Sequence, residues 1–170
     1  MKKAFPFILC VLLAAAGATI VSAQSAKTTG SEVYSWHAEL VSLDPAAKTV
    51  TVKTMAVGNA LDELNHFKKG DRVLLGWSGF DKSANAVNHV VKYESAPKAD
   101  DRFTFPAEFV GFDSPNRYVT FKAAVPAESI DKLESIKTGQ WITATSPQGA
   151  RSEKEPIVAV KGYNDPDGKS

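Results

Sequence analysis

The stretch AELVSLDPAAKTVTV at 38–52 is written a second time, as AEFVGFDSPNRYVTF at 107–121. Aligned without a gap at this offset, residues 37–73 and 106–142 are identical at 11 of 37 positions. We call two residues equivalent when this offset matches them, as it matches Ala38 with Ala107. A fixed offset of this kind indicates one structural unit that occurs twice. We therefore predict two repeat units, at 31–93 and 102–163, joined by a linker at 94–101.

Each unit is predicted to be mainly β-strand. In its first strand the apolar residues alternate up to Leu40 and then change parity at Val41, as they do at Phe109 and Val110 in the second unit. A strand that switches its apolar face needs a bulge or a sharp bend. The turns DPAAK and DSPNR follow, and in both an Asp side chain is expected to close the turn.

A short helical segment and two further strands complete each unit. The segments ALDELNHFKKG and SIDKLESIKTG space their apolar residues as a helix does, and we expect each to end in a C-cap at its Gly. The segments DRVLLGWS and NHVVKYE, matched by QWITATS and PIVAVKGY, are predicted to be strands. The predicted fold class is all-β, with two tandem small barrels of the oligonucleotide/oligosaccharide-binding (OB) type, each of four to five strands plus a short helical turn. The alternative is one fused barrel built from both repeats.

The scaffold positions of the first unit resemble those of the small periplasmic OB-like barrels of copper-efflux metallochaperones. The resemblance covers nearly all of each unit and rests on Val41 and Asp44, on KTVTVK at 48–53 and on LNHFKKGDRV at 64–73. It implies the barrel fold. In that family a His at the end of the second strand, with Met and Trp from a following segment, holds Cu(I) or Ag(I), because soft ions prefer thioether and imidazole donors. Here Lys53 stands in the place of that His and no second Met follows the lone Met55, so the ligand set of the family is not carried over.

The N-terminus has the three zones of a secretory signal peptide. Lys2 and Lys3 precede an apolar stretch that ends in the small residues Val21, Ser22 and Ala23. We expect cleavage after Ala23, which removes the signal peptide at 1–23. The mature protein is then expected to be periplasmic or secreted and to have no membrane anchor.

The composition of the mature chain excludes several function classes. Cys10 lies in the signal peptide, so disulfides, Cys-based zinc sites and a Cys nucleophile are excluded. Removal of two lysines leaves 18 basic and 19 acidic residues, a formal charge of −1. This balance lacks the basic excess of a nucleic-acid-binding protein. The C-terminal tail at 164–170, NDPDGKS, lacks the later Glu of a calcium loop.

No residue pattern predicts catalysis. The chain has no nucleophile elbow and no phosphate-binding loop. Glu39 and Glu108 are matched acids, but we expect each to pair with a lysine at the barrel rim, Lys53 or Lys122, rather than to act together as acid and base. The chain is therefore predicted not to be an enzyme and to need no cofactor.

The tryptophans are the candidate partner-binding residues. Trp77 and Trp141 each lie on a predicted third strand and are the better candidates for an exposed binding face. Trp36 and its aromatic neighbours either stack on a ligand or fill the core or the seam between the units.

The function predicted from these observations is a secreted or periplasmic, non-catalytic binding or accessory module. Its partner is an envelope protein, a peptide or a glycan. The alternative is a periplasmic metal-handling protein of the copper type, in which His37, Met55 and His66 supply the ligands.

Overall fold

The computed structural model describes residues 32–78, 86–94, 103–149, 154 and 156–163. The strands are β1 (Val33–Asp44), β2 (Thr49–Ala56), β3 (Arg72–Ser78), β4 (Ala86–Lys92), β5 (Thr104–Asp113), β6 (Tyr118–Ala124), β7 (Trp141–Pro147) and β8 (Ala159–Gly162). The helical segments are α1 (Ala60–Glu63), η1 (Leu64–His66), η2 (Ala127–Ser129) and α2 (Ile130–Glu134). The predicted signal peptide, nearly all of the linker and the C-terminal tail lie outside the described residues. No helix in the described ranges is long and apolar enough to cross a membrane.

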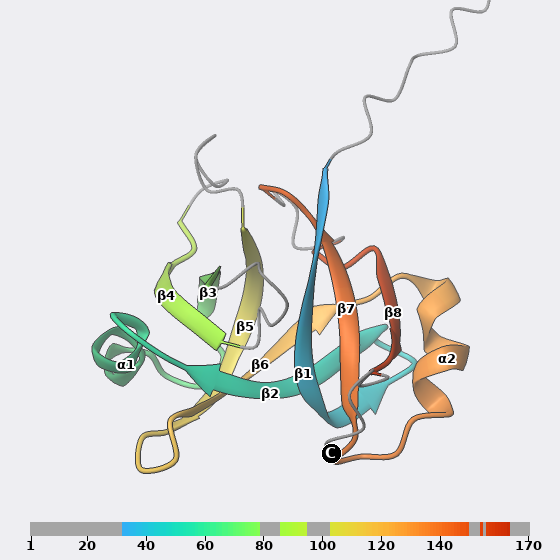
Figure 1. The fold of residues 1–170 in the computed structure, drawn as a ribbon, viewed down its shortest axis with the longest axis horizontal. Coiled ribbons are helices and arrows are strands. Elements are labelled where there is room, and N and C mark those ends of the chain that lie inside the picture. The colour runs from blue at the N-terminus through green and yellow to red at the C-terminus, as the bar shows by residue number, and fades with distance from the viewer. Residues whose placement is uncertain (1–31, 79–85, 95–102, 150–153, 155, 164–170) are drawn as a thin grey trace, which may run out of the picture.

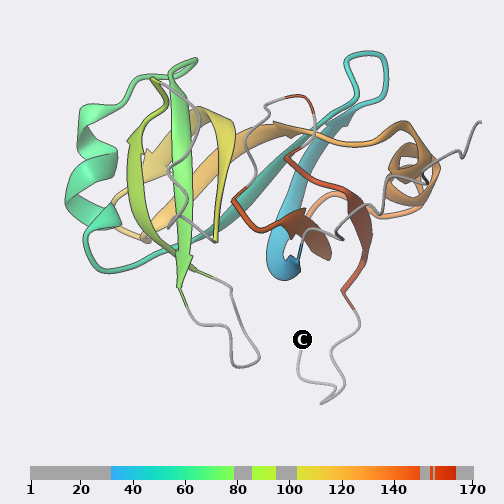
Figure 2. The ribbon, with the colours of Figure 1, turned by 90° about the horizontal axis from the view of Figure 1, so that it is seen from above.

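The strands form one sheet in the order β4-β3-β5-β6-β2-β1-β7-β8. The expected all-β class is therefore confirmed. β4 also pairs in parallel with β2, through Met55↔Ala86 and Ala56↔Val87. Five strands, β4, β3, β5, β6 and β2, therefore close into a barrel. The barrel lies on the left of Figure 1 with α1 beside it, and β1, β7 and β8 lie on the right with α2. Seen from above, the two helices occupy opposite ends of the molecule (Figure 2).

The barrel takes strands from both predicted units, which differs from the expectation that each unit closes a barrel of its own. β3 pairs with β5, from Arg72↔Glu108 onward, and β7 pairs with β1 in the same way, from Trp141↔Glu39 onward. We call residues 31–93 the first range and residues 102–163 the second range. The first strand of each range thus pairs with the third strand of the other range. Alternation along a strand decides which face is buried, but it does not select the neighbouring strand.

The predicted change of face in the first strand is confirmed. The register between β1 and β2 shifts between Leu40 and Ser42, and the register between β5 and β6 shifts between Phe109 and Gly111. Each shift is a bulge, which turns the following residues to the opposite face.

The predicted role of the turn aspartates is also confirmed. Oδ1 of Asp44 accepts a hydrogen bond from the backbone N–H of Ala47 at 2.9 Å. Oδ1 of Asp113 accepts one from the backbone N–H of Asn116 at 3.3 Å. Both aspartates satisfy a backbone donor that the tight turn leaves without a partner strand.

The predicted helix C-caps at glycine are wrong. The helical residues end at His66 and at Glu134, several residues before Gly70 and Gly139. These glycines have φ values of 93° and 87° and lie in the turns that lead into β3 and β7. The N–H of Gly70 donates to the carbonyl of Phe109 at 2.9 Å, so the positive φ serves a contact with the first strand of the other range.

The core is centred on aromatic rings from strands of both ranges. Trp36 on β1 is fully buried and stacks on Trp77 and Phe105, with ring centroids 4.8 and 5.1 Å apart. The ring of Phe121 lies 5.9 Å away, and Nε1 of Trp36 donates to Oγ of Ser146 on β7 at 2.9 Å. Aromatic pairs of this geometry stabilise a core beyond their buried area, so this cluster joins β1 and β7 to the barrel.

Candidate functional site

Two of the three candidate tryptophans lie in the core. Trp36 has no exposed surface and Trp77 is 4 % exposed, so neither can present a face to a partner. The expectation that Trp77 is exposed is therefore corrected. It shares its parity on β3 with Val73 and Leu75, both buried, and a strand points such residues to one face.

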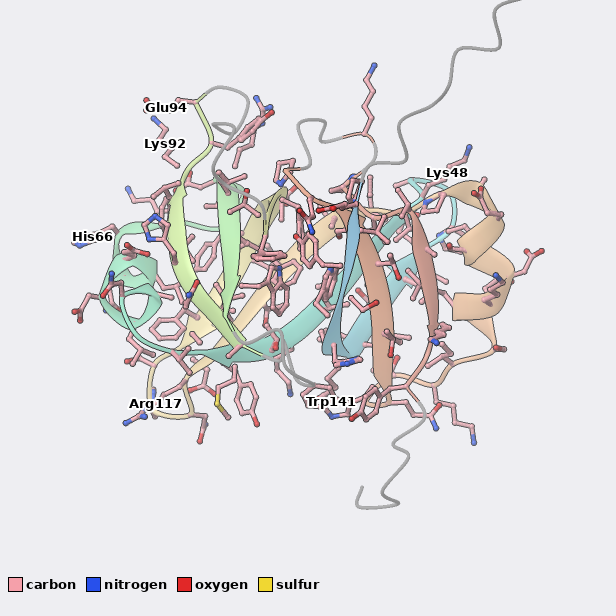
Figure 3. All side chains as sticks on the ribbon, turned by 45° about the horizontal axis from the view of Figure 1, so that its top comes forward. Lys48, His66, Lys92, Glu94, Arg117 and Trp141 are labelled. Carbon is pink, nitrogen blue, oxygen red and sulfur yellow. The ribbon has the colours of Figure 1, made fainter. Side chains whose placement is uncertain are left out.

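Trp141 is the tryptophan that reaches the surface. The next residue, Ile142, is buried, and successive side chains of a strand point to opposite faces. Trp141 therefore points outward and is 36 % exposed. Figure 3 shows it at the lower edge of the molecule. Of the three tryptophans, Trp141 is therefore the one whose side chain a partner could contact.

Several other large side chains lie on the same outer face as Trp141. We name this set the aromatic strip; its members are His37, Met55, Tyr118, Trp141 and Tyr163. The N–H of Tyr163 donates to the carbonyl of Trp141 at 3.0 Å, and the two rings lie 6.4 Å apart. Tyr163 also contacts His37, with ring centroids 4.6 Å apart, and Tyr118 is the direct cross-strand partner of Met55.

An ion pair divides the strip. Trp141 pairs with Glu39 across β7 and β1, and Glu39 pairs with Lys53 across β1 and β2. Nζ of Lys53 lies 2.9 Å from Oε2 of Glu39 and 5.3 Å from the centre of the Tyr118 ring. From Trp141 on β7 to Tyr118 on β6 the strip crosses four strands, a distance of about 14 Å, and the ion pair lies between the two rings.

The expected pairing of each matched acid with a rim lysine is confirmed. Besides the pair of Glu39 with Lys53, Oε2 of Glu108 lies 2.7 Å from Nζ of Lys122. Both carboxylates are thus engaged with their own lysine at the surface of the sheet.

His37 is held in one orientation. Its Nδ1 lies 2.9 Å from Oγ1 of Thr143, and its ring is inclined at 63° to the ring of Tyr163. Burial lowers the pKa of His37, and the nearby Lys161 ammonium lowers it further. The imidazole is therefore neutral at neutral pH and presents an uncharged polar edge to the strip.

The structure does not bring the three proposed metal ligands together. His66 ends η1 and is labelled at the left flank in Figure 3, whereas His37 is on β1 in the other part of the molecule (Figure 1). Met55 and His37 share the outer face of the strip. Within the described ranges no three His, Cys, Asp or Glu side chains are grouped so that they could hold one ion.

Two strip residues, Tyr118 and Tyr163, were not predicted from the sequence. Tyr118 has the same parity on β6 as Thr120 and Lys122, which are also half-exposed, so alternation could have identified it. Tyr163 lies just beyond the end of β8, where no alternation remains to indicate its direction.

Comparisons with known proteins give no relative for this site. No family model matches the chain, and no curated protein or solved structure is significantly similar to it.

Proposed function

We propose that the chain is a secreted or periplasmic, non-catalytic binding module that holds an envelope partner against the aromatic strip. The observation that carries this proposal is the half-exposed Trp141 beside Tyr163, next to the fixed pair of Glu39 and Lys53. Exposed aromatic rings with a polar tip are the side chains that dominate binding energy at interfaces. The signal peptide expected at 1–23 supports the location.

A glycan fits this surface better than a protein or a peptide. Sugar rings place apolar C–H faces on aromatic rings, while their hydroxyls bond to a carboxylate and an ammonium that are already fixed. Glu39 and Lys53 are paired with each other, so an uncharged partner does not need to separate them.

Tryptophan fluorescence tests the proposal. Because Trp36 and Trp77 are buried, titration with soluble envelope oligosaccharides should change the emission of Trp141 in a saturable manner. Trp141→Ala should weaken binding about tenfold or more, measured by calorimetry, because it removes a central aromatic contact. Arg72→Ala, at the equivalent position of the first range, is the matched control and should leave binding unchanged.

Three results would contradict the glycan-binding function. They are the absence of saturable binding to any oligosaccharide, binding that survives Trp141→Ala, and turnover of the bound sugar. Binding of envelope peptides or proteins in place of sugars, lost in Trp141→Ala, would contradict the glycan but retain the binding module.

A periplasmic metal-handling role is the second candidate, and its support is the common face of Met55 and His37. A thioether and an imidazole are the donors that Cu(I) prefers. Titration with Cu(I), followed by native mass spectrometry, should then show one ion per chain, lost in Met55→Leu and retained in His66→Gln. The absence of stoichiometric binding would overturn this candidate.

We also infer that the two ranges descend from one duplicated OB-like unit. The support is that the alignment of the two ranges matches β1 with β5 and β3 with β7. The pairing of β3 with β5 therefore corresponds to the pairing of β7 with β1, and the bulge of β1 corresponds to the bulge of β5.

A further inference from the structure

The aromatic strip presents its side chains in a fixed order across the sheet. Trp141 on β7 is the direct partner of Glu39 on β1, and Glu39 is the direct partner of Lys53 on β2. Nζ of Lys53 then lies 5.3 Å from the centre of the Tyr118 ring on β6. All four side chains are at least partly exposed. A ligand that crosses β7, β1, β2 and β6 therefore meets a ring, a carboxylate, an ammonium and a second ring, in that order.

The placement of the aromatic rings gives the direction of the ligand. Along β7, the next residues of the same face as Trp141 are Thr143 and Thr145, which carry no ring. Across the strands, by contrast, rings stand at both ends of the strip, with Tyr118 at one end. At the other end the rings of Trp141 and Tyr163 are inclined at 52° to each other, so they form two walls of one position. The ligand therefore runs across the strands rather than along them.

The spacing of the strands sets the length of the ligand. A 1,4-linked sugar ring advances by roughly the distance between two neighbouring strands, about 5 Å. The four strands therefore offer one position each to four successive sugar rings. The first ring lies on Trp141, the two middle rings lie over Glu39 and Lys53, and the last ring lies on Tyr118.

The central ion pair suits two neighbouring hydroxyls of a sugar. Oε2 of Glu39 and Nζ of Lys53 are 2.9 Å apart, so an acceptor stands directly beside a donor. Two equatorial hydroxyls on adjacent carbons are staggered, which keeps their oxygens about as close to each other. One hydroxyl can then donate to the carboxylate while the other accepts from the ammonium, and the pair stays intact.

The twist of the sheet selects the form of the sugar chain. Adjacent strands rotate by about 20–25°, so the surface turns by about 60–75° from β7 to β6. The flat, rigid face of a crystalline polysaccharide cannot follow this turn, whereas a single soluble chain can. Equatorial β-1,4 linkages keep such a chain extended, and α-1,4 linkages coil it. We propose, on the premise of the glycan-binding function above, that the strip binds four consecutive rings of a single, uncharged β-1,4-linked oligosaccharide.

Calorimetry of the mature protein with cello-oligosaccharides of two to six rings tests the length. The affinity should rise about tenfold or more between two and four rings and change little between four and six. Maltotetraose has the same four glucose units joined by α-1,4 linkages and should bind about tenfold more weakly than cellotetraose. Crystalline cellulose should not retain the protein. Chito-oligosaccharides, which share the β-1,4 linkage, are the second probe series.

Variants at the far end and at the centre of the strip test the positions. Tyr118→Ala should lower the affinity for cellotetraose about fivefold and leave that for cellobiose unchanged, because a disaccharide is held at the Trp141 end. Lys53→Met should lower the affinity for cellotetraose about tenfold, since it removes the central donor. Lys122→Met changes the equivalent lysine, which pairs with Glu108 outside the strip. It is the matched control and should leave the affinity unchanged.

Failure of the four-ring site is distinct from failure of the glycan function. Equal affinity for two and four rings, equal binding of cellotetraose and maltotetraose, retention on crystalline cellulose, or unchanged affinity in Tyr118→Ala would overturn the four-ring site, even where binding still depends on Trp141. Binding of neither the cello nor the chito series would overturn the β-1,4 assignment, and binding of another oligosaccharide that is lost in Trp141→Ala would then retain the glycan function. The absence of binding to every oligosaccharide overturns both.

Discussion

His37 shows how a single side chain of the strip couples its protonation to folding. The half-buried imidazole lies between Thr143 and Tyr163, and Lys161 is the charged group that lowers its pKa in addition to burial. Above the ordinary value of 6.5 the imidazole is neutral in the folded and the unfolded chain, so it adds no pH dependence there. Below that value the unfolded chain takes up a proton that the folded chain resists. The free energy of unfolding therefore falls as the pH drops toward the lowered pKa of the folded state.

His37→Gln should remove this part of the acid sensitivity. We expect the difference in free energy of unfolding between pH 7.5 and pH 5, measured by urea denaturation, to be smaller in His37→Gln than in the parent protein. His66→Gln is the matched control, because His66 is exposed at the end of η1 and should leave the difference unchanged. An equal difference in His37→Gln and the parent would contradict the assignment.

The two hairpin turns carry backbone strain at the same relative position. Lys48 and Arg117, which close the turns after β1 and β5, have φ values of 52° and 58°. A side chain in this left-handed region costs about 1 kcal/mol, which glycine avoids. Lys48→Gly or Arg117→Gly should therefore raise the free energy of unfolding by about 0.5 kcal/mol after the entropy that glycine loses on folding.

A matched control lies in the same turn. Ala46 has no positive φ, so Ala46→Gly should lower the free energy of unfolding by about 0.5–1 kcal/mol. Urea denaturation of the three variants measures the difference. A Lys48→Gly variant that is less stable than the parent would show that the turn is not strained.

At the scale of elements, the hairpins could be predicted from sequence because their determinants are local. The change of parity at Leu40, the turn aspartates and the rim pairs all depend on residues within one hairpin. Parity could also have placed Trp77 inside, next to Val73 and Leu75. The strip could not be assembled from sequence, since Trp141 meets Glu39 only through the pairing of β7 with β1.

At the scale of the whole molecule, equivalent residues of the two ranges meet each other in one shared core. Trp77 and Ser146 are equivalent residues and both contact Trp36, one by stacking and one by a hydrogen bond. Phe121 and Val52 are likewise equivalent and pair directly across β6 and β2. Trp36 and Phe105 are equivalent as well and stack on each other, so both ranges fill the core jointly.

This complementarity predicts that the two ranges stay together after the chain is cut. A protease site inserted between Glu94 and Phe103 should yield fragments that still elute as one folded species, because β1–β7, β2–β6 and β3–β5 all cross between them. Unfolding of the cut protein should become concentration-dependent, as the fragments are then separate molecules. The uncut insertion variant is the control, and gel filtration with circular dichroism over a dilution series is the measurement.

Neither range alone should form the same fold as a homodimer, since two copies of 31–93 would place two Trp77 rings where the parent has one Trp77 and one Ser146. Fragments that separate into two folded monomers would show that each range closes on itself.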